Sequence, residues 1–398
     1  MLLKAGIQST NQPDAKIHIA FLLFTDLRTG AGTENVVLNY VKNSDFTNVD
    51  ICVVETDWLY DGVYRRSESE IDSYLKNSKR IRIHSYTRPF NFMTKCEPTN
   101  FFLQIILNPI LYRIIGRVIY RKLFNDLSLL DAVILMDNNY ALCFPKHSKK
   151  HKAEIVATNH CFKPDRSVLR LLEVYPLSWW HKIQSIHLFQ NYTVCEDILT
   201  TKKMFILPNG VDSSLFQYGT KSEGKIKILF AARLTKGKGT LRAIDIWKRA
   251  KSKDKAELHI AGGGPLQNTV ANQVGDGLIY HGVLPEDELA SLYQSCDMFL
   301  YPSTEDTFSL AVIQALSTGM YCMIGSSFRG IYDEYVSRGW AEYIEPYDID
   351  AISKRIDEVV SCWADRTNER KACHCFTYQQ FDWGSITSRL YRTLSILS

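Results

Sequence analysis

The chain of 398 residues lacks both a long apolar segment and a strong excess of charge. No run approaches the roughly 18 apolar residues that a membrane-spanning helix needs. Residues 1–16 are polar and have no apolar centre, so we expect no secretory signal peptide there. A net charge of only +4 does not indicate a nucleic-acid-binding protein. From these absences we predict a cytoplasmic protein that does not act on nucleic acid.

The ten cysteines follow no disulfide framework. Most of them lie inside apolar segments, as Cys52, Cys143 and Cys296 do, which is typical of free thiols in a reducing compartment. The cluster Cys373-His374-Cys375 has ligating side chains, but no second pair stands at zinc-ligand spacing. We therefore predict no metal site.

What the chain does contain is a repeated alternation of apolar strands and helical patterns. Its length favours two domains, and the alternation predicts α/β domains with parallel sheets that helices cover on both faces. We place the domains at residues 1–207 and 208–380, with a closing helix at 381–398. The expected strands are residues 17–24, 49–56, 81–86, 132–136, 155–158 and 204–207, then 226–231, 258–261, 278–283, 297–300, 321–324 and 341–344.

The first strand runs into a loop that contains Gly30 and Gly32 and then into a helical pattern. Glycines here would let the backbone approach a ligand, as in Rossmann-like domains. Asn35 stands where the third glycine of G-x-G-x-x-G belongs, so the dinucleotide fingerprint is incomplete and a plain glycine turn stays open. His160 follows another strand, at the end where ligands of parallel sheets bind. It is either a site residue or a structural histidine.

The pattern of residues 301–319 predicts the end of a strand, then a loop, then a helix. Asp306 or Thr307 is the expected N-cap, and Gly319 stands where a C′ glycine belongs. The helix start would offer free N–H groups to an anion. Asp306 and Gln314 would lie near one helix face, about two turns apart, where they could hold two polyol groups. The alternative is a buried strand–helix unit with an ordinary cap.

A basic loop follows the first strand of the second domain. Arg233 and Lys238 could both bind a diphosphate there, the arginine through two parallel hydrogen bonds and the lysine as a point charge. A basic loop alone is a weak signal, and it gains weight from the helix start predicted at the end of a neighbouring strand.

An amphipathic pattern over residues 108–124 carries Arg113, Arg117 and Arg121 on one face. Up to Pro208 the chain has 26 Lys and Arg against 20 Asp and Glu, and Trp179-Trp180 adds an aromatic pair. Such a helix can lie on an anionic membrane surface. A sheet-covering helix with a solvated arginine stripe explains the pattern equally.

Several motifs in order resemble the retaining family 4 glycosyltransferases, also called glycosyl transferases group 1. The resemblance covers residues 205–335 well and the first domain loosely. It rests on Pro208-Asn209-Gly210-Val211-Asp212, Arg233-Leu234 with Lys238-Gly239, Gly262-Gly263-Gly264-Pro265, His281-Gly282-Val283, the stretch 302–319, Gly30-Ala31-Gly32-Thr33-Glu34 and His160. It implies the GT-B fold, with two Rossmann-like domains facing a central cleft. Residues 378–397, with Phe381-Asp382-Trp383, resemble the closing helix that returns to the first domain.

The resemblance also implies site roles. Arg233 and Lys238 would neutralise the donor diphosphate, together with the backbone of Ser309 and Leu310, and Gly32 would let the first loop close over it. Asp306 would hold sugar hydroxyls and Gln314 the ribose, although the family has glutamate at both positions. The full expected donor-binding set is Gly32, Arg233, Lys238, Gly262, Gly264, Val283, Glu305, Asp306, Thr307, Phe308, Ser309, Leu310 and Gln314; the catalytic set is Asp306, His160, Arg233 and Lys238.

We therefore expect a transferase that moves a sugar from a nucleoside-diphosphate sugar to a glycan or lipid-linked acceptor, in bacterial surface polysaccharide or lipopolysaccharide synthesis. No cofactor or metal is expected, and an anionic membrane surface is a further expected partner, on the inner face of the plasma membrane. The alternatives are a sugar-nucleotide epimerase of the same fold, a nicotinamide-dependent oxidoreductase, or a binding-only relative. Turnover of a nucleotide sugar without an acceptor would identify the epimerase, and NAD binding would identify the oxidoreductase. The absence of any turnover would identify the binding-only relative.

Overall fold

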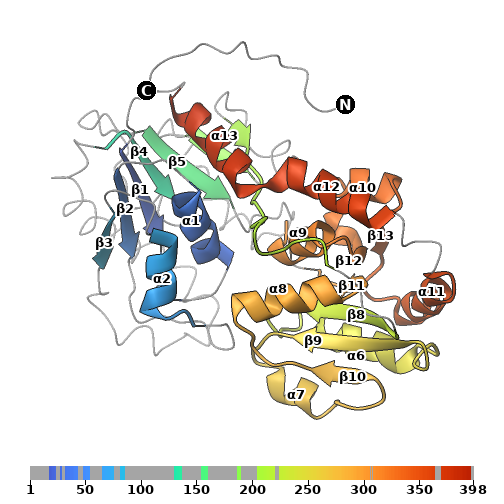
Figure 1. Ribbon diagram of the computed structural model, residues 1–398. Coiled ribbons are helices and arrows are strands. Elements are labelled where there is room, and N and C mark those ends of the chain that lie inside the picture. The colour runs from blue at the N-terminus through green and yellow to red at the C-terminus, as the bar shows by residue number, and fades with distance from the viewer. Residues whose placement is uncertain are drawn as a thin grey trace, which may run out of the picture.

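The computed structural model describes residues 18–23, 27–28, 32–43, 48–53, 65–75, 81–85, 130–136, 154–159, 186–189, 204–219, 224–304, 306, 308–363 and 369–395. These residues form two α/β halves, each built on one parallel sheet (Figure 1). The predicted fold class is confirmed. Among the described residues, no helix is long and apolar enough to cross a membrane.

The first sheet has seven parallel strands in the order β3-β2-β1-β4-β5-β6-β7. Its strands are β1 (His18–Leu23), β2 (Asn48–Val53), β3 (Ile81–Ser85), β4 (Ala132–Leu135), β5 (Glu154–Asn159), β6 (Ile186–Phe189) and β7 (Met204–Ile206). The helices described with it are α1 (Gly32–Lys42) and α2 (Glu68–Leu75). The central strand β1 is almost entirely apolar and buried, as expected of a strand covered on both faces.

The second sheet has six parallel strands in the order β10-β9-β8-β11-β12-β13. Its strands are β8 (Ile226–Ala231), β9 (Ala256–Ala261), β10 (Leu278–Tyr280), β11 (Met298–Tyr301), β12 (Tyr321–Gly325) and β13 (Ala341–Ile344). Its helices are α6 (Thr240–Arg249), α7 (Gln267–Ala271), α8 (Glu286–Ser295), α9 (Leu310–Ser317), α10 (Asp333–Ser337), α11 (Ile349–Ser361) and α12 (Arg370–Phe381), with a 3₁₀ turn, η3, at Ser326–Phe328. The strand order reverses between β8 and β11, which is where open α/β sheets bind ligands.

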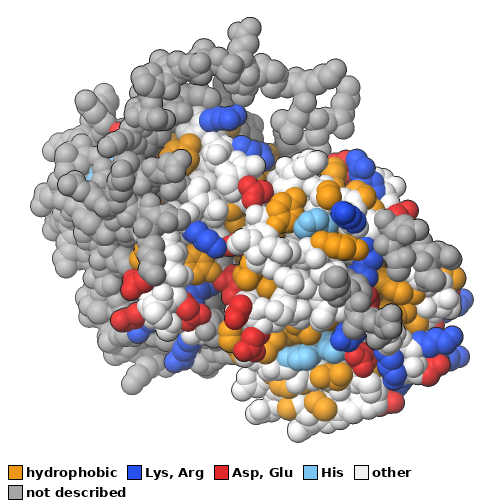
Figure 2. Space-filling view, in the orientation of Figure 1, with side chains coloured by type: hydrophobic (Ala, Val, Ile, Leu, Met, Phe, Trp, Pro, Cys, Tyr) orange, Lys and Arg blue, Asp and Glu red, His pale blue; other side chains and the backbone are white. Residues whose placement is uncertain are grey.

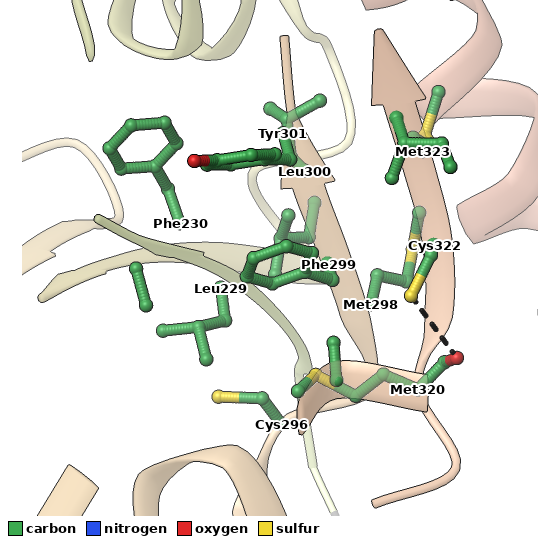
Figure 3. Packing of buried hydrophobic residues seen from close by; sticks show 14 of the residues in the cluster. Leu229, Phe230, Cys296, Met298, Phe299, Leu300, Tyr301, Met320, Cys322 and Met323 are labelled. Atoms are coloured by element: carbon green, nitrogen blue, oxygen red, sulfur yellow. Dashed lines mark hydrogen bonds between the residues drawn. The ribbon is translucent and has the colours of Figure 1, made fainter. Parts of the chain in front are cut away.

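The core of the second half is aromatic along the two central strands. Phe230 of β8 packs against Tyr301 of β11, with ring centroids 6.0 Å apart, and Phe299 stacks on Tyr301 at 5.4 Å (Figure 3). All three side chains are at most 1% exposed. This packing fixes β8 and β11 side by side and so fixes the loops that leave their carboxyl ends.

The chain crosses between the halves twice, and the two crossings pair with each other. The N–H of Val211 donates to the carbonyl of Phe381 at 2.7 Å, and Val211 forms a β-bridge with Asp382. A Cβ on Gly210 would lie 2.5 Å from the ring of Trp383, so a side chain cannot replace this glycine without displacing the tryptophan. From Trp383 the helix α13 (Trp383–Ser395) packs into the core of the first half (Figure 1).

Three element boundaries differ from the sequence predictions. The helix expected from Asp306 or Thr307 begins only at Leu310, because Ser309 has a φ of 58° that no α-helical residue adopts. The strand expected over 278–283 ends at Tyr280, before Gly282 with its φ of 71°. The single closing helix is two helices, broken at the extended residue Asp382.

One strand, β6, was not predicted at all. It has four residues, Ile-His-Leu-Phe, and no turn signals flank it closely. Its pairing with β5 and β7 places it in the sheet, so tertiary pairing rather than local pattern defines it. The cap at Gly319 is confirmed: its N–H donates to Leu316 at 3.0 Å, and Met320 donates to Ala315 at 3.0 Å, which together form a Schellman motif.

Candidate functional site

The candidate site lies at the carboxyl ends of β8 and β11, where the order of the second sheet reverses. The loop after β8 and the loop after β11 are tied together by a backbone hydrogen bond and by the side chain of Arg242 of α6. The N–H of Thr304 donates to the carbonyl of Gly237 at 3.1 Å. The guanidinium of Arg242 donates to the same carbonyl at 3.1 Å and to that of Pro302 at 2.9 Å. The two loops therefore form one surface.

An ion pair joins the same two loops. The ammonium of Lys238 contacts Oδ1 of Asp306, and both side chains are partly shielded, with 30% and 13% exposed. Oδ2 of Asp306 accepts a hydrogen bond from the Tyr301 hydroxyl at 2.5 Å and another from the Ser303 hydroxyl at 3.1 Å. The structure thus brings two of the predicted site residues into direct contact.

The N-terminus of α9 faces this loop region. Tyr332, which is fully buried, donates its hydroxyl to the carbonyl of Phe308 and lies 3.5 Å from that of Ser309. These contacts hold the backbone just before the helix and so fix the positions of its first N–H groups, those of Leu310 and Ala311. The next N–H, that of Val312, donates to the Ser309 carbonyl at 3.2 Å. The first N–H groups and the ammonium of Lys238, which is paired with Asp306, are the hydrogen-bond donors that the structure places at the switch point.

Glycines let the neighbouring loops pack closely. A Cβ on Gly262, whose φ is 125°, would lie 2.0 Å from the carbonyl oxygen of Ala232, directly before Arg233. A Cβ on Gly239, with a φ of 88°, would lie 2.4 Å from the carbonyl oxygen of Pro302. Gly264, the other predicted glycine, packs against Leu234 in the same way. The glycine loop therefore lies against the Arg233 strand end.

The other predicted residues surround this centre at different distances. Arg233 is partly buried in the loop after β8, and Gln314 is half-buried on α9. Val283 is 39% exposed beyond β10. Gly32 opens α1 in the first half, and a Cβ there would lie 4.0 Å from Leu310 at the start of α9. The start of α1 thus lies next to the start of α9.

Several predictions fall on residues outside the described part of the chain. These are His160, Glu305 and Thr307 of the expected site, and the arginine stripe and tryptophan pair of the expected membrane face. Within the described ranges, no group of three or more His, Cys, Asp or Glu side chains is arranged to hold a metal ion.

The sequence analysis missed Tyr301, Ser303, Tyr332 and Arg242 as parts of this site. Burial raises the pKa of Tyr301 well above its usual value, and the neighbouring charge of Asp306 raises it further. The hydroxyl therefore stays protonated and donates to the carboxylate. The available signal was a tyrosine that ends an otherwise apolar strand, a position where a hydroxyl can reach the loop that follows.

The motif around His281 belongs to a polar chain at the β9–β10 edge rather than to the ion pair. His281 Nε2 and His259 Nδ1 are hydrogen-bonded at 2.9 Å, and His259 Nε2 bonds Glu257 at 2.9 Å. Burial lowers the pKa of both imidazoles, so both are expected to be neutral at pH 7. This chain joins β9 to the residues after β10.

The chain is similar to known glycosyltransferases. Residues 212–374 match the family model described as Glycosyl transferases group 1. The uncharacterized glycosyltransferase MJ1607 of Methanocaldococcus jannaschii is 24% identical over 267 residues, 62% of this chain and 68% of that protein. The phosphatidylinositol N-acetylglucosaminyltransferase gpi3 subunit of Schizosaccharomyces pombe is 22% identical over 52% of this chain and 47% of its own length.

The fold has close counterparts among solved structures. Anabaena Alr3699/HepE in complex with UDP superposes with a TM-score of 0.68 at 12% identity, over 95% of this chain and all of that one. Such neighbours are GT-B glycosyltransferases, so the predicted GT-B architecture is confirmed.

Proposed function

We propose that this chain is a retaining glycosyltransferase with a nucleoside-diphosphate sugar as donor, and the match of residues 212–374 to the glycosyl transferases group 1 model supports the transferase activity. The supporting observation is the meeting of Lys238, the loop of Arg233 and the α9 N-terminus where the sheet order reverses. The leaving nucleoside diphosphate gathers negative charge in the transition state, and fixed positive groups stabilise that charge. The HepE complex with UDP supports a nucleoside diphosphate in this fold.

The donor is tested first by binding. Thermal shift with a panel of UDP-, GDP-, ADP- and dTDP-sugars should raise the melting temperature with one nucleotide class, because a ligand that binds only the folded state stabilises it. Turnover of that donor is then measured in Arg233→Ala and Lys238→Ala. Loss of a charge-assisted hydrogen bond, about 1.5–3 kcal/mol, should lower turnover at least tenfold. The control is Lys248→Ala, an exposed lysine in the last turn of α6. Near-normal activity in both site variants would contradict the proposal.

We propose that transfer needs no metal ion, since Lys238, Arg233 and the α9 N-terminus already supply positive charge. Activity should then survive EDTA. Complete loss that Mg²⁺ or Mn²⁺ restores would place the enzyme in a different mechanistic class.

We propose a glycan or lipid-linked acceptor of surface polysaccharide or lipopolysaccharide synthesis, reached at the inner face of the plasma membrane. The S. pombe relative is named for a phosphatidylinositol acceptor, and the arginine stripe of residues 113–121 supports attraction to an anionic surface. Binding to liposomes of phosphatidylglycerol, but little to phosphatidylcholine, is expected, and it should weaken with salt.

The triple change of Arg113, Arg117 and Arg121 to Gln should abolish liposome binding. The matched control changes three lysines of the second half, Lys248, Lys251 and Lys255, to Gln and should leave binding intact. Wild-type protein that ignores anionic liposomes at low salt would favour a soluble acceptor.

A further inference from the structure

Tyr301 is an aromatic side chain with one polar atom, and that atom is directed at the site. Tyr301 is 1% exposed, and its ring packs against those of Phe230 and Phe299 (Figure 3). A third ring, that of Phe328, also lies against it, and the three centroids are 5.4 to 6.1 Å away. The ring is therefore held rigidly in the core. Its hydroxyl donates to Oδ2 of Asp306 at 2.5 Å.

The carboxylate of Asp306 is correspondingly constrained. Oδ2 accepts from two hydroxyls, those of Tyr301 and Ser303, which fill the usual capacity of one carboxylate oxygen. The other oxygen, Oδ1, is thereby turned toward the ammonium of Lys238. An ammonium has three N–H donors, so two stay available for phosphate oxygens after one is bound to Asp306.

We infer that Tyr301, acting through Asp306, positions the ammonium of Lys238 for the donor diphosphate. Tyr301 is thus a positioning residue, and Asp306 in this chain serves the diphosphate side of the donor rather than the sugar hydroxyls. The inference rests on the proposed function, because it requires a nucleoside-diphosphate donor at Lys238. Asp306 is one methylene shorter than the glutamate of the family that this chain resembles. The shorter side chain keeps the carboxylate of Asp306 within reach of Tyr301 and Ser303.

The two roles of Asp306 predict different binding losses. If Asp306 positions Lys238, Tyr301→Phe lowers the affinity for the nucleoside diphosphate and for the nucleotide sugar by the same factor. If Asp306 holds sugar hydroxyls, only the nucleotide sugar loses affinity. The probes are UDP, GDP and ADP with UDP-glucose, GDP-mannose and ADP-glucose, measured by titration calorimetry.

One nucleoside diphosphate and its matching nucleotide sugar are expected to bind the wild-type protein. We expect Tyr301→Phe to lower the affinity for both by about tenfold, the effect of losing one hydrogen bond to a charged group. The donor KM should rise by the same factor, and kcat should fall with it, because the same ammonium stabilises the charge that the leaving diphosphate gains. In a Lys238→Gln background, Tyr301→Phe should add less than twofold, because its effect passes through the lysine. The matched control is Tyr293→Phe, which removes another fully buried tyrosine hydroxyl that does not contact Asp306.

Three outcomes separate the possibilities. If the wild-type protein binds a probe and Tyr301→Phe binds it with the same affinity, the inference is overturned. A loss of affinity confined to the nucleotide sugars overturns it as well. Wild-type protein that binds none of the six probes contradicts the proposed function itself. If Tyr301→Phe does not fold, Ser303→Ala removes the second donor to the same oxygen, and an equal weakening of both ligand types is again the expected result.

Discussion

The amide of Gln314 stands on α9 where the resembling family has a carboxylate. It is half-buried two residues beyond Val312, and its side chain makes no hydrogen bond to another described residue. An amide can bond a ribose diol, but without the strength of a charged acceptor. Its role therefore depends on whether the donor reaches it.

Gln314→Ala should raise the donor KM about two- to tenfold, the effect of losing a neutral hydrogen bond of about 0.5–1.5 kcal/mol. Gln314→Glu should keep or improve activity, because a carboxylate bonds the same diol more strongly. Steady-state kinetics with the identified donor measures both. Unchanged kinetics in the alanine variant would show that the residue is only helix surface.

Gly262 and Gly275 allow clash and backbone strain to be separated, since both have a φ of 125°. An alanine at Gly275 meets nothing within 4 Å, whereas at Gly262 its Cβ would lie 2.0 Å from the Ala232 carbonyl oxygen. Both changes should cost about 1–3 kcal/mol of backbone strain. Gly262→Ala should cost more and also weaken donor binding, because it displaces the Arg233 loop. Thermal melting and donor titration compare the two variants. Equal losses of stability and of donor affinity would mean that the Arg233 loop shifts to accommodate the added methyl group.

Among the helices, α12 is fastened to the sheet by one buried ion pair. Arg370 donates to Asp297 at 2.9 Å, to the Gly319 carbonyl at 2.8 Å and to the Cys296 carbonyl at 3.2 Å. Only 6% and 8% of the two side chains are exposed. The pair ties α12 to the cap of α9 and to the start of β11, so it supports the loops of the site from the opposite end of their elements.

Arg370→Met should lower the free energy of unfolding by about 3–5 kcal/mol, because Asp297 is left buried without its cation. Urea unfolding followed by tryptophan fluorescence reports the loss, since Trp363 stacks on Arg370. Arg338→Met is the control: this arginine is 46% exposed and should cost under about 1 kcal/mol. A loss no larger than the control's would mean that water reaches Asp297.

Two polar contacts join the halves of the molecule, and side chains of both charge signs lie on the described surface in Figure 2. Lys42 of α1 bonds Asp212 at 2.6 Å, and Tyr74 of α2 bonds Glu286 at the start of α8. Burial alone would raise the pKa of Asp212, but hydrogen bonds from Lys42 and Ser214 and the charge of Lys42 outweigh it and hold that pKa below its ordinary value. The contact therefore stabilises the folded protein above the ordinary carboxyl pKa of about 3.9 and is lost as the pH falls below it.

Asp212→Asn should lower the melting temperature at neutral pH, and its difference from wild type should shrink as the pH falls from 6 toward 3. The control is Asp276→Asn, which breaks a Lys–Asp pair within one half whose carboxylate is 76% exposed. It should change little at any pH. A difference for Asp212→Asn that does not depend on pH would show that the amide replaces the carboxylate fully.

Local pattern sufficed for most of the fold and for the location of the site. The apolar runs of β1, β8 and β12 and the glycine cap of α9 are set by residues adjacent in sequence, so the sequence predicted them. The alternation of strands and helices also determined the parallel sheets, and the placing of charged and glycine-rich loops at strand ends indicated the region of the site.

Tertiary packing decided the rest. The start of α9 is set by Ser309 and by the Tyr332 hydroxyl 23 residues further along the chain, which no helical pattern contains. The orientation of Asp306 depends on a tyrosine whose ring is fixed by Phe230, far away in sequence. Sequence spacing can name the charged residues of a site, but the direction in which each side chain points depends on partners that only folding brings together.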